Sequence, residues 1–361
     1  GTVGATLGSA LPAPLAGKSH WPRGGAPASA RDRHLRAAAP AASPFDLRDV
    51  ELLPSPFAKA RERDARYMLS LDPDRLLHNF RVNAGLEPKA PVYGGWESQE
   101  PWVDIRCHGH TLGHWLTAAG LMVASTADAR FQERIDYIVD ELKACQDAGG
   151  TGLVCAFPDG AEQLENAVRG ERFIGVPWYT MHKILAGLRD AHVQGGSEAA
   201  LEVLVRLADW TREATGPLSD DGFERMLRRE HGGMNEVLAD VHVLTGDDRY
   251  LSLAERFSHK AILEPLARGE DVLDGLHANT QIPKVVGFQR LYELTGRPEY
   301  RAAARFFWER VALHRSFATG GHGDVEHFFP VDEFEEHLHS AKTMETCCAY
   351  NMLRLTRVLF G

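Results

Sequence analysis

A helical repeat is the feature that most constrains the fold of this chain. The segment VLTGDDRYLSLAERF at 243–257 matches ELTGRPEYRAAARFF at 293–307, with their Thr-Gly pairs 50 residues apart. A weaker copy, ASTADARFQERIDYI, occupies 124–138, and a fourth begins at Gln194. Each copy has a helix, a short turn with a small residue, and an aromatic or aliphatic residue that opens a second helix. A period of this length indicates stacked helix pairs.

The hydrophobic pattern predicts an all-α protein. Apolar residues recur at helical spacing in five segments, and no alternating strand pattern of comparable strength accompanies them. The five segments are 111–145, 178–213, 232–262, 278–314 and 346–360. Stacked helix pairs form either an open solenoid or a closed ring of six hairpins, the (α/α)6 toroid. We count about five pairs and a final half, so we expect a toroid that is incomplete at the C-terminus.

The composition is that of a soluble globular protein and excludes several functions. Hydrophobic residues make up 44% of the 361 residues, charged residues make up 25%, and the formal net charge is −10. An acidic balance argues against nucleic-acid binding, and no apolar run is long enough to span a membrane. The 5 cysteines are too few and too scattered for a disulfide scaffold. A P-loop, a nucleotide fingerprint, HExxH and GxSxG are all absent.

The first 44 residues differ in composition from the rest of the chain. Thr2–Gly17 is small and apolar, and Pro, Ala and Gly dominate as far as Pro44. We interpret residues 1–44 as a disordered remnant of an export signal and a linker, with a gene-start or cloning artefact as the alternative. Residues 45–361 would then form the helical domain, and we expect a periplasmic or extracellular protein.

Histidines recur at equivalent places in the repeat. His114, His182, His231 and His277 lie 12, 12, 14 and 18 residues before the turns of their repeats, near the start of each first helix. In a ring of parallel hairpins these starts share one end, so the four histidines would converge on one polar funnel. For any one of them, a core or surface position is the alternative. Nearby aromatic and polar residues that suit the stacking and edge recognition of sugar rings are Trp96, Trp102, Trp178, Tyr179, Asn235, Glu236, Asn279 and Gln281.

A segment near the C-terminus carries a candidate general acid. It reads TGGHGDVEHFFPVDEFEEHLHSAKTMETCCAYN from 319 to 351, and its glycines indicate an irregular loop. Glu326 follows these glycines. We expect Phe328 and Phe329 to desolvate its carboxyl, which favours the protonated form that a general acid needs. An ordinary solvated glutamate is the alternative.

Glu345 and Cys347 have the chemistry of zinc ligands. Carboxylate and thiolate both suit tetrahedral zinc, and these two residues would reach one ion if they lay in a turn or at a helix start. The pair Cys347 and Cys348 is not a CxxC knuckle, so two buried small hydrophobic residues are the alternative. The remaining cysteines, which we expect to be structural thiols, are Cys107, Cys145 and Cys155.

Several of these motifs together resemble one group of glycosidases. TGGHGDVEHFFP followed by METCCAYNMLRLTRVLF is similar to the TGGxSDGExF…ETCxxYNMLKLTR signature of glycoside hydrolase families 127 and 146, the β-L-arabinofuranosidase-like enzymes. PWYTMHKILAGL, HGGMNEVLADVHVLTGD and CHGHTLGHWLTA are similar to that group as well. The resemblance runs from about Phe45 to Phe360. It implies an (α/α)6 barrel followed by β-sandwich domains, which lie outside this chain.

The resemblance also implies a retaining mechanism that departs from the usual pair of carboxylates. Glu326 matches the acid/base position, and Glu345 and Cys347 match two positions that bind Zn²⁺. In the family the nucleophile is a zinc-bound cysteine in a Cys-Cys motif farther downstream. Because that motif lies beyond Gly361, we expect this chain to be inactive alone, and Cys348 does not take the place of the nucleophile.

The resemblance finally implies a substrate and the residues that bind it. His182, His231 and His277 match family histidines that hydrogen-bond the furanose hydroxyls, and His110 and Trp178 are further candidates. The substrates would be L-arabinofuranosides of plant cell-wall glycans. Two alternatives stay open: another toroid sugar enzyme, such as an unsaturated uronyl hydrolase or an epimerase, and a non-catalytic glycan-binding protein. The sequence does not indicate an oligomeric state.

Overall fold

Helices make up most of the part of the chain that the computed structural model describes, residues 42–98, 107–171 and 175–360. These residues form α-helices, short 3-10 turns and isolated β-bridges, and they contain no strand. The all-α prediction is therefore confirmed. No described helix is both long and apolar enough to cross a membrane. Most of the predicted export segment, residues 1–41, lies outside the described residues.

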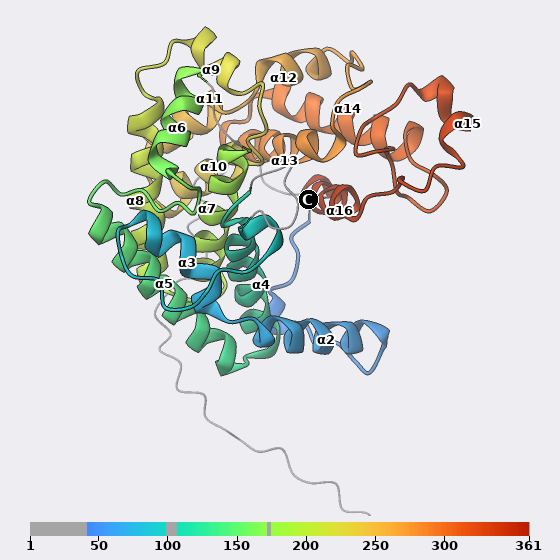
Figure 1. Ribbon diagram of the computed structural model, residues 1–361. Coiled ribbons are helices and arrows are strands. Elements are labelled where there is room, and N and C mark those ends of the chain that lie inside the picture. The colour runs from blue at the N-terminus through green and yellow to red at the C-terminus, as the bar shows by residue number, and fades with distance from the viewer. Residues whose placement is uncertain (1–41, 99–106, 172–174, 361) are drawn as a thin grey trace, which may run out of the picture.

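Five inner helices form the centre of the bundle, the first four of them each begin a helix pair, and each contacts the next in chain order (Figure 1). They are α4 (His110–Thr126), α7 (Pro177–Val193), α10 (Met234–Thr245), α13 (Ala278–Thr295) and α16 (Thr346–Phe360). Four outer helices follow the first four of them: α5 (Ala129–Gly149), α8 (Glu198–Thr215), α11 (Asp248–Arg256) and α14 (Pro298–His314). Because each outer helix returns the chain to the end where its pair began, the inner helices all run in one direction.

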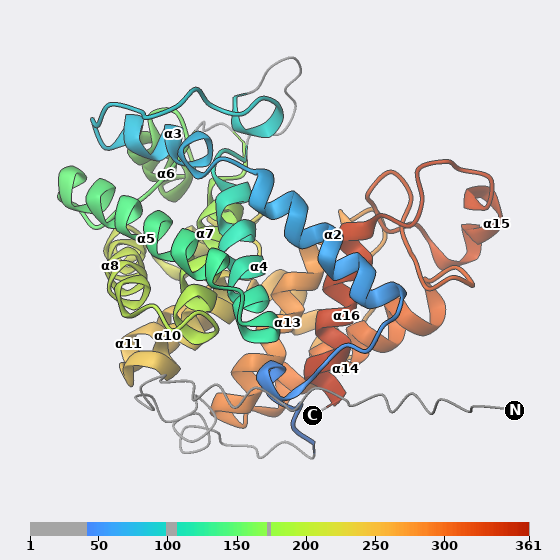
Figure 2. The same cartoon turned by 90° about the horizontal axis from the view of Figure 1, so that it is seen from below.

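Shorter or peripheral elements complete the bundle. In Figure 2, α2 crosses the side of the bundle next to α4, and the segment between α14 and α16 extends to one side with α15 at its outer end. The peripheral helices are α2 (Pro56–Ser70), α3 (Pro73–Asn83), α6 (Gly160–Arg169), α9 (Asp220–Met226), α12 (Lys260–Ala267) and α15 (Phe334–His337). The 3-10 turns are η1 (Leu47–Asp49), η2 (Gly95–Glu97) and η3 (Val331–Glu333).

The turns between inner and outer helices repeat one structure. Thr126, Thr245 and Thr295 end α4, α10 and α13, and each hydroxyl donates to the carbonyl four residues earlier, at 2.6, 2.8 and 2.7 Å. The same oxygens accept the N–H two residues later, at 3.3, 3.2 and 3.3 Å. In two of the turns an aspartate, Asp128 or Asp247, then caps the outer helix. The repeat in the sequence is therefore a repeat of one helix–turn–helix geometry.

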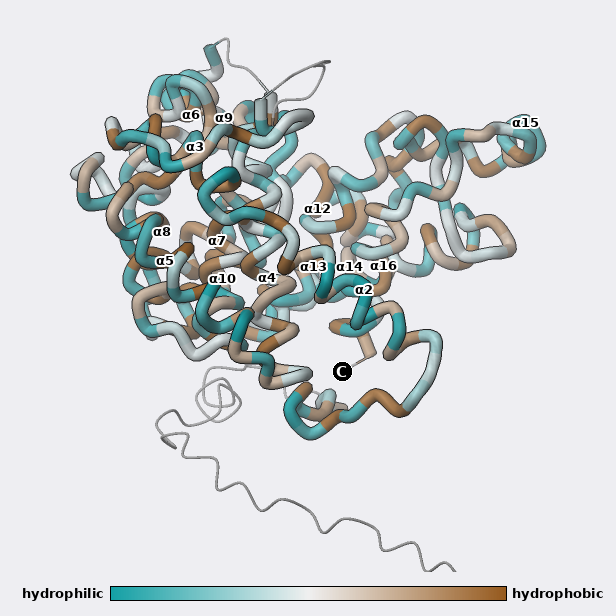
Figure 3. The backbone as a smooth tube through the Cα atoms, turned by 60° about the horizontal axis from the view of Figure 1, so that its bottom comes forward, coloured by the Kyte–Doolittle hydropathy of each residue, from teal (hydrophilic) through white to brown (hydrophobic). Residues whose placement is uncertain are grey.

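Burial differs between the two layers. The outer helix α8 buries residues spaced three and four apart, such as Val203 and Leu207, and its tube changes between hydrophobic and hydrophilic colours along its length (Figure 3). The inner helix α7 is buried on most of its surface. Glycine permits the close approach of α4 to α7, because a Cβ at Gly113 would lie only 2.2 Å from the Lys183 carbonyl oxygen.

Candidate active site

The candidate site lies at the N-terminal ends of the inner helices. His277 is the N-cap of α13, His231 precedes α10 by three residues, and His114 and His182 lie in the first two turns of α4 and α7. Since these helices run in one direction, the four histidines share one end of the bundle. The spacing argument from the sequence is confirmed in this respect. We call this end the mouth.

The loop that carries Glu326 is held against the start of α13. The Glu326 carbonyl accepts the Ala278 N–H at 2.7 Å, and the carboxyl Oε2 lies 3.3 Å from His277 Nε2. Val325 and Glu326 have φ angles of 45° and 66°, in the left-handed region that residues with a side chain rarely adopt. Such a conformation persists only where the surrounding structure imposes it. The loop therefore places the Glu326 carboxyl beside His277 at some conformational cost.

Phe328 and Phe329 do not desolvate Glu326, so that expectation from the sequence is wrong. Phe328 packs against Phe307 and stacks on His322, and Phe329 is buried among other aromatic rings. The Glu326 side chain is 50% exposed. The two phenylalanines pack the loop onto the core, while the Glu326 carboxyl stays half exposed to solvent.

Glu345 and Cys347 come together immediately before and at the start of α16. Cys347 is exposed as a residue, yet partial burial of its thiol, together with a hydrogen bond and the charge of Glu345, raises the pKa of Cys347 to about 11. Glu326 acts in the same direction. Cys348 is buried and its sulfur lies 3.5 Å from Glu345 Oε2, so the buried-hydrophobe interpretation holds for Cys348 and not for Cys347.

These two groups alone do not make a zinc site. Catalytic zinc has three protein ligands and structural zinc has four. Among the described residues, no three His, Cys, Asp or Glu side chains are grouped as a metal site would require. Glu345 and Cys347 offer two donors, and the pKa of Cys347 is raised by partial burial and by the neighbouring carboxylates.

Two buried lysines lie beneath the mouth, and the sequence analysis missed both. Lys183 on α7 is 8% exposed, and burial together with the nearby Arg354 lowers its pKa to about 8. Lys284 on α13 is almost fully buried, and burial likewise lowers its pKa to about 8. The Lys284 ammonium donates to Gln281 Oε1 at 3.0 Å and lies 3.2 Å from His259 Nδ1. The mouth therefore carries positive charge below its histidines.

Glu230 is a second carboxyl at the mouth that the sequence analysis missed. It lies half-buried just before His231 and close to the side chain of Thr280, which favours its charged form. Burial raises the pKa of Glu230, although His277 and the two buried lysines act in the opposite direction. The only signal in the sequence was its place next to a motif histidine, because helical periodicity does not indicate a charge on a buried face.

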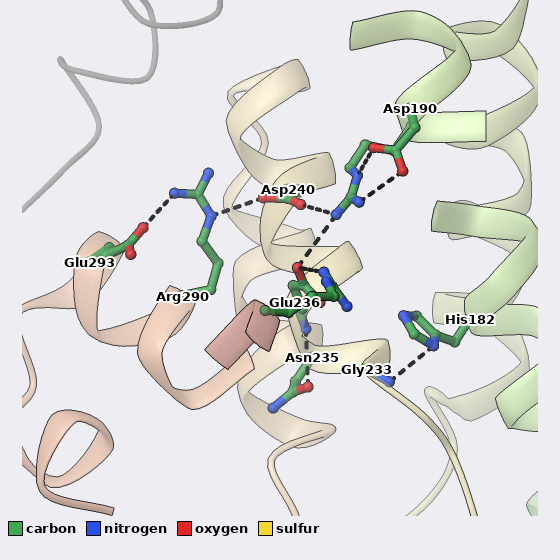
Figure 4. Close-up of polar contacts among 10 residues, drawn as sticks. His182, Asp190, Gly233, Asn235, Glu236, Asp240, Arg290 and Glu293 are labelled. Carbon is green, nitrogen blue, oxygen red and sulfur yellow. Dashed lines mark hydrogen bonds and ion pairs between the residues drawn. The ribbon is translucent and has the colours of Figure 1, made fainter. Parts of the chain in front are cut away.

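His182 and His110 are buried polar residues near the mouth. The His182 ring accepts the Gly233 N–H at Nδ1, at 3.1 Å, and burial holds its pKa well below the usual value, so it is neutral (Figure 4). His110 Nδ1 donates to the Cys107 carbonyl at 2.7 Å. Its ring lies among those of Trp96 and Tyr179, with centroids 5.2 and 6.1 Å away.

His231 and Trp178 lie in the core. His231 Nδ1 donates to the Arg229 carbonyl at 3.1 Å, and its Nε2 is buried with no partner among the described residues. Trp178 is 2% exposed and packs on Trp210 and Phe257. A buried indole presents no face to a sugar ring, so this arrangement gives Trp178 a packing role. Trp102 lies outside the described residues.

A chain of buried ion pairs joins the inner helices below the mouth (Figure 4). Arg354 on α16 donates to Glu236 Oε1 at 2.5 Å, and Arg189 on α7 lies 3.7 Å from the same oxygen. Asp240 on α10 accepts from Arg189 at 2.6 Å and from Arg290 on α13 at 2.8 Å. The network therefore ties four of the five inner helices together through charges that have little access to solvent.

Comparison with known protein families matches residues 49–361 to the catalytic domain of β-L-arabinofuranosidase, GH127. The chain belongs to glycoside hydrolase family 127. The match covers the whole helical bundle, including the loop of Glu326 and the start of α16. A comparison with curated proteins finds no match.

Solved structures similar to this GH127 chain have the same fold. A GH127 β-L-arabinofuranosidase from Geobacillus stearothermophilus T6 is 18% identical with a TM-score of 0.56, over 84% of this chain and 49% of that one. The GH127 β-arabinofuranosidase BT3674 is 16% identical with a TM-score of 0.64, over 88% of this chain and 51% of that one. At these identities the likeness concerns the fold alone. The chain spans about half the length of these structures.

The family assignment confirms the resemblance found in the sequence, and with it the toroid-like helical fold. It also excludes the first of the two alternatives that the sequence left open, another toroid sugar enzyme such as an unsaturated uronyl hydrolase or an epimerase, because membership of GH127 separates this chain from those enzymes. The mouth brings His277 and Glu326 into contact and places Glu345 and Cys347 near them. Trp178 and His231 stay apart from that group.

Proposed function

We propose that the protein is a retaining β-L-arabinofuranosidase with Glu326 as its acid/base and plant cell-wall glycans as its substrates. The observation that carries this proposal is the Glu326 carboxyl at the mouth of a GH127 catalytic domain, 3.3 Å from His277 Nε2 and half exposed. An exposed carboxyl can reach a glycosidic oxygen, and a histidine beside it can orient it.

In the first step Glu326 gives its proton to the leaving oxygen as the glycosidic bond breaks and the anomeric carbon bonds to the nucleophile. In the second step Glu326 takes a proton from water, and the water oxygen replaces the nucleophile. His277 Nε2–H can donate to the Glu326 carboxylate that forms between the steps. We propose a cysteine nucleophile that lies outside the described residues, so residues 1–361 alone would not turn over substrate.

A zinc ion is part of the same proposal. Glu345 and Cys347 would supply two of its ligands, and the other donors would come from outside the described residues. When bound, zinc would favour thiolate over thiol, which matters because the pKa of Cys347 is raised to about 11 without a cation. We also propose that the protein is exported to the periplasm or the cell exterior, where it would meet plant glycans.

The decisive experiment is a panel of p-nitrophenyl glycosides on the full-length protein. We expect hydrolysis of the β-L-arabinofuranoside, with the α-L-arabinofuranoside and the β-L-arabinopyranoside as controls for anomer and ring size. Glu326→Gln should lower kcat/KM by about 10²–10⁴, and a chelator or Cys347→Ser should abolish turnover. Turnover that survives both chelator and Cys347→Ser would exclude the zinc–thiolate mechanism. Sugar binding without any turnover would instead support the glycan-binding alternative.

A further inference from the structure

Glu326 lies in a turn of only two residues. The Asp324 N–H donates to the His327 carbonyl at 2.9 Å, and the His327 N–H donates to the Asp324 carbonyl at 3.0 Å. Val325 and Glu326, between them, have φ angles of 45° and 66°. A two-residue hairpin with positive φ at both positions corresponds to a type I′ turn, which strongly prefers Asn-Gly, Asp-Gly or Gly-Gly. The residues of this turn therefore disfavour the conformation that they adopt.

Val325 contributes most to this conflict. A β-branched residue at positive φ is a conformational outlier, and it persists only where the surrounding structure imposes it. The Val325 residue is 54% exposed, so packing of its side chain offers little compensation. The backbone of Glu326 is attached on one side, where its carbonyl accepts the Ala278 N–H at 2.7 Å. The compensation on the other side must come from the residues that contact Asp324 and Val325.

A closed ring of hydrogen bonds joins the turn to the segment before α16. Ser340 Oγ donates to Asp324 Oδ1 at 2.6 Å and accepts the Lys342 N–H at 3.2 Å. The Lys342 carbonyl in turn accepts the Val325 N–H at 3.0 Å, which returns the ring to the residue next to Asp324. The Asp324 carboxylate therefore supports the backbone bond that holds Val325 in place.

His337 attaches the same carboxylate to the core. Its Nδ1 donates to Asp324 Oδ2 at 2.7 Å, and its ring stacks on the buried ring of Phe329 with a centroid distance of 3.9 Å. The hydrogen bonds from Ser340 and His337 lower the pKa of Asp324, so both oxygens accept from an ionised carboxyl. We call Asp324, Ser340 and His337 the Asp324 cluster.

We propose that Asp324 is a positioning residue for the acid/base: its carboxylate, held by Ser340 and His337, stabilises the disfavoured turn and so keeps the Glu326 carboxyl beside His277. This inference rests on the proposed role of Glu326. Without the Asp324 cluster the turn would relax toward negative φ, and the Glu326 carboxyl would leave its place 3.3 Å from His277 Nε2. A misplacement of about 1 Å at a reacting group can lower a rate about 10²-fold.

The first test separates proton transfer from stability. It compares kcat/KM of the full-length enzyme on two β-L-arabinofuranosides: the methyl glycoside, whose leaving oxygen needs a proton, and the 2,4-dinitrophenyl glycoside, whose phenolate leaves without one. Asp324→Ala should lower kcat/KM about 10²-fold on the methyl glycoside and less than about twofold on the dinitrophenyl glycoside. Equal losses on both substrates would indicate a merely structural role and overturn the inference.

Three further variants serve as controls for this comparison. Asp332→Ala removes an exposed aspartate of η3 in the same segment and should change neither rate. Ser340→Ala should lower the rate on the methyl glycoside about tenfold, as expected for one lost hydrogen bond to a charged group, whereas Ser340→Thr keeps the hydroxyl and the rate. Ser340 is only partly buried, so this pair keeps the test valid if Asp324→Ala fails to fold. An unchanged rate in Ser340→Ala would contradict the inference.

A rescue experiment tests whether the Asp324 cluster acts on the turn. Glycine adopts positive φ without a steric cost, so Val325→Gly removes much of the conflict that the cluster compensates. Adding Val325→Gly to Asp324→Ala should therefore restore most of the lost rate on the methyl glycoside. If the double variant is as slow as Asp324→Ala, the cluster does not stabilise the turn and the inference is wrong.

The second test needs no activity. Hydrogen exchange of the full-length protein, followed by mass spectrometry, reports on the peptides that contain Val325 and Ala278, whose N–H groups hold the turn. Asp324→Ala should speed exchange in both peptides, and Asp332→Ala in neither. Unchanged exchange in Asp324→Ala would overturn the inference. If the wild type fails to hydrolyse arabinofuranosides, the proposed function fails, whereas the exchange rates still decide whether Asp324 holds the turn.

Discussion

The two ends of the inner helices are built in opposite ways. At the C-terminal ends, Thr126, Thr245 and Thr295 make the same local hydrogen bonds, all within four residues along the chain. At the mouth, contacts join segments far apart in sequence, such as His277 with Glu326 and Gly233 with His182. Three of the four turns therefore repeat one geometry, whereas the contacts at the mouth differ from repeat to repeat even though a histidine recurs there.

This difference shows how a repeated fold can carry a single site. A local turn depends on a few neighbouring residues, so the same short sequence produces it each time. The mouth needs different side chains from each repeat, because one site requires distinct groups at distinct places. Residues that depart from the repeat at a shared structural position are thus the candidates for chemistry. Variants at the two ends, and in the network between them, test this contrast.

The largest effect on stability is expected in the ion-pair network. Asp240→Ala leaves Arg189 and Arg290 without the carboxylate that both contact. Removing one partner of a buried ion pair costs about 3–5 kcal/mol, measured as the free energy of unfolding in urea. Asp248→Ala, at the exposed start of α11, is the matched control and should change stability by less than about 0.5 kcal/mol. Equal losses in the two variants would contradict a special role for the network.

The same carboxylate predicts a loss of stability in acid. Burial alone would raise the pKa of Asp240, but Arg290 and Arg189 outweigh it and lower the pKa below its usual value. A lowered pKa means that the stabilisation is complete above the unfolded-state value of about 3.9 and is lost as the pH falls through the folded-state value. The difference in the free energy of unfolding between wild type and Asp240→Asn, measured in urea, should therefore shrink below about pH 4. A difference that stays constant from neutral pH into acid would argue against the two arginines as the cause.

A smaller effect is expected where α4 meets α7. Gly113→Ala puts a methyl group 2.2 Å from the Lys183 carbonyl oxygen, and backbone cannot move aside as a side chain can. Overpacking of this kind costs about 1–3 kcal/mol. Gly149→Ala, at the end of α5, meets nothing within 4 Å and should not destabilise the protein. If thermal melting shows the two variants to be alike, the helices are less tightly packed than the structure indicates.

The smallest effect is expected at the repeated turns. Asp128 accepts the Arg130 N–H at 3.1 Å as the N-cap of α5, and Asp128→Ala should cost about 1 kcal/mol. Asp128→Ser keeps a capping oxygen and should lose less stability than Asp128→Ala. Both variants should leave kcat/KM of the full-length enzyme unchanged, because the turn lies at the end away from the mouth. A change in kcat/KM would show that the two ends are coupled.

Much of the fold was predictable because its signals are local. The turn marks Thr126, Thr245 and Thr295 fall at the last residues of α4, α10 and α13. The spacing of His277 from its turn also predicted that it lies at the shared end. Glu326 was found from its loop, although the expected desolvation by Phe328 was wrong, since a sequence does not show on which side of a backbone a ring lies.

Other features of the site had no signal in the sequence. Glu230 and Lys183 stood out only as neighbours of motif histidines, yet the structure places Glu230 at the mouth near His277 and Lys183 beneath it. Trp178 was predicted to face a sugar and instead packs in the core. A helix that is buried on nearly all sides, as α7 is, gives no periodic pattern from which a pocket-facing residue could be told from a packing one.

The sequence by itself determined that this protein is a bundle of paired helices with its four repeat histidines and its acidic loop at one end, while the likeness to GH127 came from its motifs alone. That was possible because helix periodicity, turns and caps depend on residues close together in the chain. Only the tertiary structure decided which groups meet: Glu326 with His277, Arg354 with Glu236, and Arg189 with Asp240. Those contacts depend on how distant helices pack, and packing also sets the burial that shifts the pKa values of Lys183 and Glu230.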